Sequence, residues 1–287
     1  MERVVFVGPG RLGLALGYAL SRAESELSLN YCGRDAEPPE HPLFLEGRAS
    51  YRQGFQRPTA PGTAVVITVP DSAVAEVAVG LANEGSPSAG TVAVHCSGAI
   101  GADALTSMHH RGYSIGTLHP LEAVAAGFVR SDRFHSSFFA VSGEPEALSA
   151  CRRLITLLGA TPITVPTSGR PQYHAAAVIV SNYLVTLLEL GTRLFQRAGA
   201  AEGDAEAALI ALARGTLDNV REVGPERALT GPIARGDIDT VELHLRALDP
   251  GEARLYAELG RRTLGLVEAR LDLELVERLK TLFSRYA

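Results

Sequence analysis

The chain has 287 residues, enough for one large domain or two ordinary ones, and its 46% hydrophobic and 21% charged residues are typical of globular proteins. A net charge of −5 and the absence of tryptophan argue against a nucleic-acid-binding surface. Three widely spaced cysteines exclude a disulfide framework and a cysteine zinc site, and they indicate a reducing cytoplasm.

The first half of the chain alternates between short apolar segments and helical spacing. Glu2 and Arg3 lead directly into a strand pattern, which predicts that residues 1–7 are not a signal peptide. Strands are expected at 3–8, 27–32, 64–69, 91–96, 113–118, 138–142 and 162–165, and helices at 11–22, 72–82 and 144–159. Continuous apolar strands bounded by glycine and proline are typical of a parallel sheet covered on both faces, which predicts an α/β fold.

Two segments depart from this alternation. Residues 33–62 carry five prolines, so an irregular connection is expected there in place of a full crossover helix. After residue 166 only helical patterns remain, at 172–198, 204–222, 239–248, 251–270 and 272–286. "DTVE" (239–242) has the spacing of a capping box and predicts a helix start. An all-α domain is therefore expected over 167–287, after an α/β domain over 1–166.

The longest uncharged run, "PQYHAAAVIVSNYLVTLL" (171–188), is interrupted by polar residues. This pattern favours a buried helix over a membrane span.

The motif "VVFVGPGRLGLAL" (4–16) predicts a dinucleotide-binding loop. It places glycines as G-x-G-x-x-G between a strand and a helix, so that the loop turns tightly and backbone N–H groups meet a pyrophosphate. The expected cofactor contacts are Gly8, Pro9, Gly10, Arg11, Leu12 and Gly13. With this motif the first domain is predicted to be a Rossmann-like doubly wound sheet.

The end of the second strand indicates which cofactor binds. Cys32 and Gly33 stand where NAD-binding proteins usually carry an acidic residue, and Arg34 follows. A guanidinium suits a 2′-phosphate, so NADP is favoured over NAD, although Asp35 could still reach a ribose hydroxyl.

Three further strand ends carry polar groups. Val69 ends the strand at 64–69, Pro70 and Asp71 follow it, and all three are expected to contact the cofactor. The alternative is that Asp71 or Ser72 merely caps the next helix. Ser97 follows the next strand, and His119 follows the one after it. Because these ends meet at one edge of the sheet, Ser97 is predicted to contact cofactor and substrate. His119 is predicted to act as a catalytic acid or base, against the alternative of a loop histidine bonded to backbone.

The motifs GPGRLG, TVPD, HCSGA and LHPL, followed by "SGRPQYHAAAVIVSN" (168–182), resemble the 6-phosphogluconate dehydrogenase-like superfamily. Its members include pyrroline-5-carboxylate reductase, ketopantoate reductase and prephenate dehydrogenase. The whole chain is most similar to a branch of Rossmann-like oxidoreductases with a C-terminal helical domain of unknown function. The resemblance implies substrate contacts by Ser97 and by His119 with Pro120, and pairing of subunits through the helical domain.

The same resemblance implies a catalytic lysine and an asparagine on the first long helix of the second domain. This chain has no lysine there; His174 stands in its place, and Asn182 follows eight residues on. Both are predicted to be catalytic, with His174 as a substrate-orienting group or an acid. The alternative for His174 is a solvated residue at the helix start. In "ALTGPIARGD" (228–237), Thr230, Arg235 and Asp237 are expected to meet a substrate carboxylate, although a plain interhelical turn explains them equally well.

These features predict a cytoplasmic, homodimeric, NADP-dependent oxidoreductase without a metal, acting on a small oxo or imino acid or its hydroxy or amino counterpart. Ketopantoate is the first substrate to test, and a dehydrogenase coupled to decarboxylation is a weaker option. The alternative class is a non-catalytic NADP-binding regulatory or interaction protein, which the missing helix lysine favours.

Overall fold

The computed structural model describes residues 2–125 and 129–286. The contacts within the chain divide it into two compact units, Met1–Leu184 and Val185–Ala287. Each unit is described by itself.

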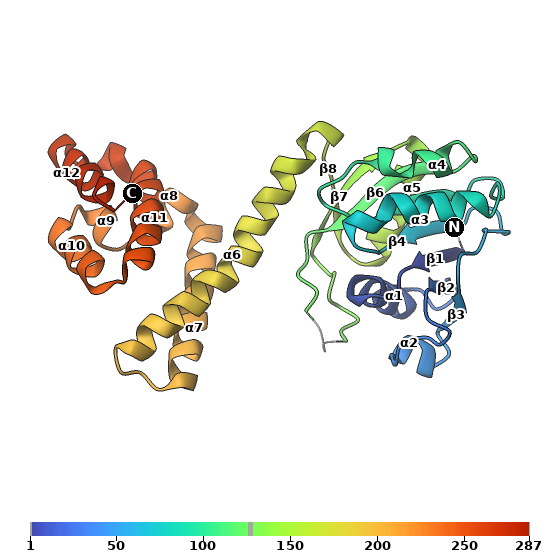
Figure 1. Cartoon of the computed structure of the whole chain (residues 1–287), viewed down its shortest axis with the longest axis horizontal. Coiled ribbons are helices and arrows are strands. Elements are labelled where there is room, and N and C mark those ends of the chain that lie inside the picture. The colour runs from blue at the N-terminus through green and yellow to red at the C-terminus, as the bar shows by residue number, and fades with distance from the viewer. Residues whose placement is uncertain (1, 126–128, 287) are drawn as a thin grey trace. The chain divides into compact units, whose positions relative to one another are not determined.

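The first unit is built on one eight-stranded sheet with the order β3-β2-β1-β4-β5-β6-β7-β8 (Figure 1). The strands in chain order are β1 (Arg3–Val7), β2 (Ser28–Gly33), β3 (Ala49–Gln53), β4 (Ala64–Ile67), β5 (Val92–His95), β6 (Ser114–Pro120), β7 (Phe138–Gly143) and β8 (Thr161–Thr164). All neighbours from β3 to β6 pair in parallel. The order reverses between β1 and β4, which is the switch point of a Rossmann-like sheet and confirms the predicted fold class.

The direction of β7 and the presence of β3 differ from the prediction. β7 runs antiparallel to β6, because no crossover helix lies between them in residues 121–125 and 129–137. β3 is an edge strand inside the proline-rich segment that was expected to be irregular. Its sequence, "ASYRQ", is too polar to carry the apolar signal of a buried strand. The expected absence of a full crossover helix there is confirmed, since α2 (Pro42–Leu45) is a single turn.

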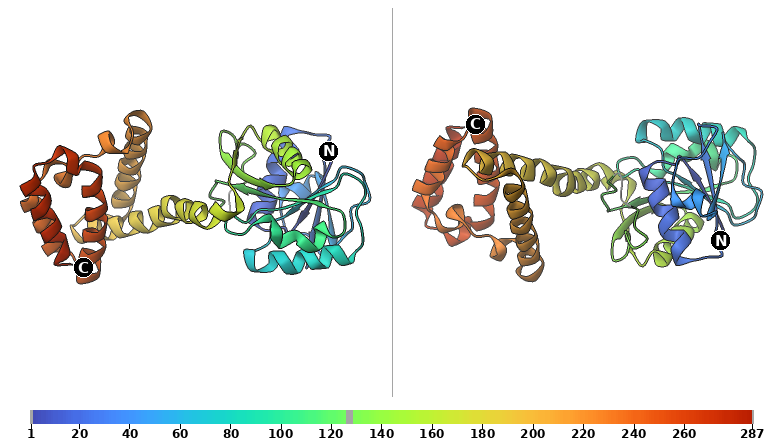
Figure 2. Two further views of the ribbon diagram at one scale, coloured as in Figure 1. Left: turned by 90° about the horizontal axis from the view of Figure 1, so that it is seen from above. Right: turned by 90° about the horizontal axis from the view of Figure 1, so that it is seen from below.

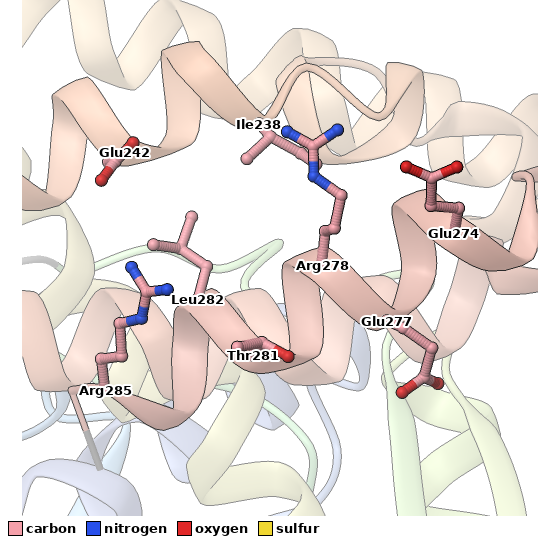
Figure 3. Close-up of a pocket in the computed structure, with 8 residues that line it drawn as sticks. All are labelled: Ile238, Glu242, Glu274, Glu277, Arg278, Thr281, Leu282 and Arg285. Atoms are coloured by element: carbon pink, nitrogen blue, oxygen red, sulfur yellow. The ribbon is translucent and has the colours of Figure 1, made fainter.

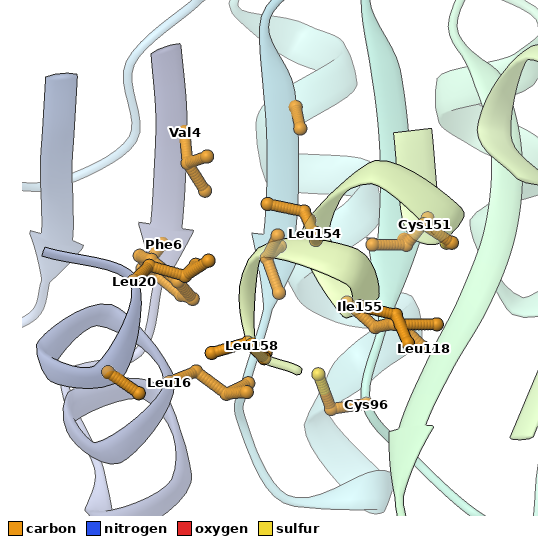
Figure 4. Close-up of a cluster of buried hydrophobic side chains, with 14 of the residues drawn as sticks. Val4, Phe6, Leu16, Leu20, Cys96, Leu118, Cys151, Leu154, Ile155 and Leu158 are labelled. Carbon is orange, nitrogen blue, oxygen red and sulfur yellow. The ribbon is translucent and has the colours of Figure 1, made fainter. Parts of the chain in front are cut away.

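Helices cover both faces of this sheet (Figure 2). On one face, Val4 and Phe6 of β1 share a hydrophobic cluster with residues of α1 (Arg11–Ala23) and α5 (Pro145–Leu157), as Figure 4 shows. On the other face, Val5 and Val7 pack in a cluster with α3 (Val74–Asn83) and α4 (Thr106–His109). The alternation along β1 therefore fills two cores, as expected for a strand buried on both faces.

The second unit is helical. It contains α7 (Glu202–Val223), α8 (Pro225–Ala228), α9 (Pro232–Arg235), α10 (Ile238–Ala247), α11 (Pro250–Val267) and α12 (Leu273–Ser284), with α10, α11 and α12 around a shared apolar cluster. α6 (Arg170–Arg197) begins in the first unit and ends in the second. The expected domain boundary at 166/167 lies just before α6, whereas the division by contacts lies within it.

The predicted capping box at 239–242 is wrong. α10 begins at Ile238, and its N-cap is Asp237, whose carboxylate accepts hydrogen bonds from the backbone N–H and the hydroxyl of Thr240. A capping box does occur at α11, between Asp249 and Glu252. Both aspartates in "GDIDT" fit a cap by residue type, and the backbone turn at Gly236, which has φ of 69°, selects the first one.

The prediction that the uncharged run forms a buried helix is also wrong for the single chain. Within α6 only Arg170 is buried, and apolar side chains such as Val180 and Val185 are about two-thirds exposed. The segment Thr167–Arg197, with a mean hydropathy of 1.5 in its most apolar window, is long and apolar enough to cross a membrane. A single helix of this kind indicates a membrane span only weakly.

Candidate active site at the carboxyl edge of the sheet

The glycine loop after β1 is closely packed. Gly8 has φ of 98°, and a Cβ there would lie 2.8 Å from Val69 Cγ1. A Cβ on Gly13 would lie 2.6 Å from the carbonyl oxygen of Gly8. The Thr68 hydroxyl donates a hydrogen bond to that same carbonyl at 2.6 Å, which fastens the loop to the end of β4. Both glycines are therefore needed for the loop to form.

Gly10, the middle glycine of the loop, has open space where a side chain would stand. Gly10 is the N-cap of α1, and a Cβ built on it would come no closer than 3.9 Å to any neighbouring atom. No side chain caps α1, and its first turn, which starts with the exposed Arg11 and the half-buried Leu12, contains no acidic residue. Free N–H groups at a helix N-terminus suit an anion. The loop from Gly8 through Pro9 to Gly13 thus fits the pyrophosphate of a dinucleotide.

Two arginines stand at the end of β2 and on the neighbouring strand β3. Arg34 and Asp35 follow β2 directly, and both side chains are exposed. Their backbone carbonyls accept hydrogen bonds from Gln53 and Tyr51 of β3, at 2.9 and 2.7 Å. Arg52 on β3 pairs in register with Cys32, and its charge lowers the pKa of that buried thiol, against the larger raising effect of burial. The sequence prediction missed Arg52, because β3 itself was not predicted.

The end of β4 lies against the glycine loop. Val69 contacts the position that a side chain on Gly8 would take. Pro70 is the N-cap of the short 3₁₀ helix Asp71–Ala73, and no side chain caps it. Asp71 is exposed, and neither this 3₁₀ helix nor α3, whose N-cap is Ala73, has a side-chain cap.

The loop after β5 is organised by buried side chains. His95 is fully buried; its Nδ1 accepts the backbone N–H of Ser97 and its Nε2 lies 2.8 Å from the carbonyl of Gly101. The Ser97 hydroxyl accepts hydrogen bonds from the backbone N–H groups of Ala99 and Ile100. Ser97 is only 6% exposed, so in this arrangement its oxygen holds the turn. These bonds give His95 a structural role in the turn.

His119 and His174 meet over Gly98. His119 is the penultimate residue of β6, so it lies inside the strand and not after it as expected. The two imidazole centroids are 5.7 Å apart at an interplanar angle of 80°. A Cβ on Gly98 would lie 2.5 Å from His174 Nδ1 and 2.8 Å from His119 Nε2. Only glycine therefore fits beneath this pair of rings.

Tyr173 fixes the other side of the His119 ring. Its hydroxyl lies 2.6 Å from His119 Nδ1, and the two rings pack edge to face. Burial, with smaller effects from His174 and Arg170, lowers the pKa of His119 from 6.5 to about 4, and the Asp71 carboxylate opposes this. Burial raises the pKa of Tyr173 to about 12. At neutral pH both groups are uncharged.

Arg170 anchors the start of α6 to the sheet. Its guanidinium is fully buried and donates hydrogen bonds to the carbonyls of Ser97 and Gly98 at 3.0 and 3.2 Å, and to the hydroxyl of Thr117 on β6. Burial lowers the pKa of Arg170. These bonds connect one side chain to the loop after β5 and to the neighbouring strand β6.

Sequence reasoning missed Arg170 and Tyr173, although a signal for them exists. In "RPQYH" (170–174), Arg170, Tyr173 and His174 are spaced i, i+3 and i+4, so they share one face of α6. Once His174 was singled out, this spacing pointed to the other two.

Asn182 is not part of this cluster. It lies eight residues beyond His174, which is about 12 Å along a helix axis. Its side chain is exposed and accepts a hydrogen bond from Ser181 at 2.8 Å.

The predicted substrate loop lies in the second unit. Thr230 and Arg235 are exposed, and Arg235 ends the one-turn helix α9. Asp237 is occupied as the N-cap of α10, which gives it a structural role.

A separate hollow in that unit lies between α10 and α12 (Figure 3). Glutamate and arginine side chains such as Glu242, Arg278 and Arg285 line it, and it contains none of the predicted site residues. Within residues 2–125 and 129–286 no cluster of three metal-ligating side chains occurs.

The lowered pKa of His119 predicts how stability depends on pH. Between about pH 6.5 and 4 the unfolded chain binds a proton at His119 that the folded chain does not, so stability falls as pH falls through this window. His95 and His41, whose pKa values burial also lowers, act in the same direction.

His119→Gln is expected to reduce the slope of unfolding free energy against pH by up to about 1.4 kcal/mol per pH unit. Urea denaturation of the full chain measures this. The exposed His110→Gln is the control, and equal slopes in both variants would contradict the assignment.

Comparison with known proteins agrees with this architecture. Residues 2–120 match the model of a Rossmann-like domain, and residues 137–263 match that of a domain of unknown function, DUF2520. No curated protein matches the chain.

Several solved structures share the fold. Protein TM1727 from Thermotoga maritima is 24% identical, with a TM-score of 0.69 over 93% of this chain and 99% of its own. BF3122 from Bacteroides fragilis, a candidate NADP oxidoreductase, is 22% identical, with a TM-score of 0.71 over 92% and 98%. The pyrroline carboxylate reductase of Plasmodium falciparum, with NADP bound, is 13% identical, with a TM-score of 0.62 over 99% of both chains. At these identities the likeness establishes the fold alone. By sequence, the chain is thus similar to a Rossmann-like domain over residues 2–120 and to DUF2520 over residues 137–263.

Proposed function

We propose that this protein is an NADP-dependent oxidoreductase that transfers hydride between NADP(H) and a small oxo or imino acid, or its hydroxy or amino counterpart. The observation that carries this proposal is the pair of imidazoles, His119 and His174, packed over Gly98 at the sheet edge that also holds the glycine loop. In open α/β sheets, ligands bind at this edge. The likeness to solved oxidoreductase structures, one of them with NADP bound, supports the same class.

The arrangement suits reduction of a carbonyl or imine. A bound nicotinamide cofactor would supply the hydride. His119 is neutral at physiological pH and its Nε2 has no hydrogen-bond partner within residues 2–125 and 129–286, so it is able to donate to the substrate heteroatom. The half-buried His174, whose Nδ1 also lacks a partner in the described part of the chain, would orient the substrate. Thr230, Arg235 and Asn182 remain proposed contacts for the substrate carboxylate and carbonyl. Ser97 and Asp237 would contribute indirectly, because their hydrogen bonds stabilise the turns in which they lie.

We prefer NADP over NAD because two guanidinium groups, Arg34 and Arg52, lie at the end of β2 and on its neighbour β3. Neither forms an ion pair within the described residues, so both charges are available for a 2′-phosphate.

Arg34→Ala is expected to weaken NADPH binding about tenfold, the scale of one lost charged hydrogen bond, and to leave NADH binding within about twofold. Fluorescence titration of both cofactors measures this. Arg153→Ala, which removes an exposed arginine from α5, is the matched control. A stronger affinity for NADH in the unmodified protein would refute the NADP preference.

Turnover is tested with NADPH and a panel of 2-oxo acids and cyclic imines, with ketopantoate first. Absorbance loss at the nicotinamide band is expected with at least one compound. His119→Ala is expected to reduce kcat about 100-fold or more while NADPH still binds, because it removes the proton donor. No absorbance loss with any compound would contradict the enzyme proposal.

A second candidate function is a non-catalytic NADP-binding regulator or interaction protein. The absence of lysine from α6 favours it. In that case His119→Ala and His174→Ala keep the NADPH affinity, and the unmodified protein has no turnover to lose.

We also propose a cytoplasmic homodimer that pairs through the helical domain. The cysteines Cys32, Cys96 and Cys151 are all free and buried, as expected in a reducing compartment. α6 has no charged residue between His174 and Glu189, and its exposed apolar side chains are Ile179, Val180, Tyr183, Val185, Leu187 and Phe195. Apolar surface of this extent is typical of an interface.

Light scattering at micromolar concentration is expected to give twice the chain mass of 30.4 kDa. Val180→Glu is expected to shift the protein toward the monomer, because it places a charge on the apolar face of α6. Leu273→Glu, at a residue of α12 that is 83% exposed, is the control and should leave the mass unchanged. A monomeric unmodified protein would contradict the proposal.

A further inference from the structure

We propose that Tyr173 is a positioning residue that holds His119 in the tautomer with its proton on Nε2 and replaces that proton after it is transferred to substrate. The inference deepens the proposed oxidoreductase function and rests on it. It identifies where the proton in the reduction comes from.

The geometry leaves one consistent arrangement of protons. The Tyr173 hydroxyl lies 2.6 Å from His119 Nδ1, and no other hydrogen-bond partner of this hydroxyl occurs within residues 2–125 and 129–286. If Nδ1 carried the proton and donated it, the phenolic proton would have no acceptor among these residues. When the phenol donates to Nδ1, both groups are satisfied, and the imidazole proton then sits on Nε2.

The ionisation of the two groups agrees with this arrangement. Burial raises the pKa of Tyr173 to about 12, so the phenol keeps its proton at neutral pH. Burial lowers the pKa of His119 to about 4, so its ring stays neutral with one nitrogen as an acceptor. Nε2 faces the space beside Gly98 and is not sealed from solvent, so it can meet a substrate atom.

The buried guanidinium of Arg170 completes the arrangement. It lies one turn before Tyr173 on α6, and its charge opposes the rise in the pKa of that phenol. Within the described residues no ion pair joins Arg170 to a carboxylate, so its charge is not neutralised locally. A transient phenolate at Tyr173 would therefore be stabilised.

The proposed reduction adds one hydride and one proton to the substrate carbonyl. Hydride from the reduced nicotinamide forms a C–H bond at the substrate carbonyl carbon while the C=O π bond breaks, so the substrate is reduced and the cofactor oxidised. The substrate oxygen takes the Nε2 proton of His119 while Nδ1 takes the phenolic proton of Tyr173. Nε2 then takes a proton from solvent, and Nδ1 returns its proton to the phenolate. One hydride and one solvent proton are added to the carbonyl. His119 shifts from one neutral tautomer to the other and returns when solvent protonates Nε2 and Tyr173 recovers its proton from Nδ1.

Two-dimensional ¹H–¹⁵N NMR of the imidazole rings tests the tautomer without any substrate. The His119 signals are assigned by their loss in His119→Gln. In the unmodified protein they are expected to show a protonated Nε2 and a bare Nδ1, and Tyr173→Phe should remove this preference while keeping the ring packing. Tyr113→Phe is the matched control, since Tyr113 is another buried phenol with a pKa raised to about 12, and no partner of its hydroxyl occurs in residues 2–125 and 129–286. A proton on Nδ1 in the unmodified protein, or the same tautomer in Tyr173→Phe, would overturn the proposal.

Kinetics test the second half of the proposal. With a substrate found in the turnover panel, Tyr173→Phe is expected to lower kcat 10- to 100-fold with KM and NADPH affinity within about twofold, whereas Tyr113→Phe is unchanged. An unchanged kcat in Tyr173→Phe would refute the proton replacement. If the unmodified protein turns over no compound, the proposed function fails, and the NMR result still decides whether Tyr173 sets the tautomer.

Discussion

The buried guanidinium of Arg170 is the interaction on which the candidate site depends. A buried charge is costly unless hydrogen bonds replace its lost water, and Arg170 finds these bonds at the carbonyls of Ser97 and Gly98 and the hydroxyl of Thr117. All three acceptors belong to the loop after β5 or to β6. The first turn of α6 is thereby locked to the edge of the sheet. Tyr173 and His174, three and four residues further on, are carried against His119 as a consequence.

This packing also determines the charge state of His119. Taking His119 out of water, beside another imidazole and a guanidinium, disfavours its charged form and leaves a neutral hydrogen-bond donor. A neutral imidazole is suited to meet a developing negative charge on substrate oxygen, provided that its tautomer is fixed. The phenol of Tyr173, which lies 2.6 Å from Nδ1, is placed to serve that purpose. In this way the residues that hold α6 to the sheet also set the protonation state of the site.

In the neighbouring loop after β5, side chains of types that often act in catalysis have structural roles. From the sequence, Ser97 and His119 both fit a chemical role at a strand end, one with a hydroxyl and the other with an imidazole. In the structure, the side chains of Ser97 and His95 form their hydrogen bonds with backbone groups of residues 97–101. Of His95, Ser97 and His119, it is His119 that keeps a side-chain nitrogen without a partner in the described part of the chain. The difference lies in which backbone groups each side chain reaches, and no local pattern encodes that.

The local sequence by itself determined the α/β sheet, the glycine loop and the helical second half, because apolar periodicity and glycine spacing act over a few residues. It could not reveal β3, whose polar residues are held as an edge strand by pairing with β2, nor the antiparallel direction of β7. The choice of Asp237 over Asp239 as the cap of α10 likewise depended on the turn before it. The spacing of Arg170 and Tyr173 indicates that they share a helix face. Only the tertiary structure determines that this face contacts His119. Contacts between residues more than 50 positions apart depend on how whole elements pack, and that packing is a property of the folded chain.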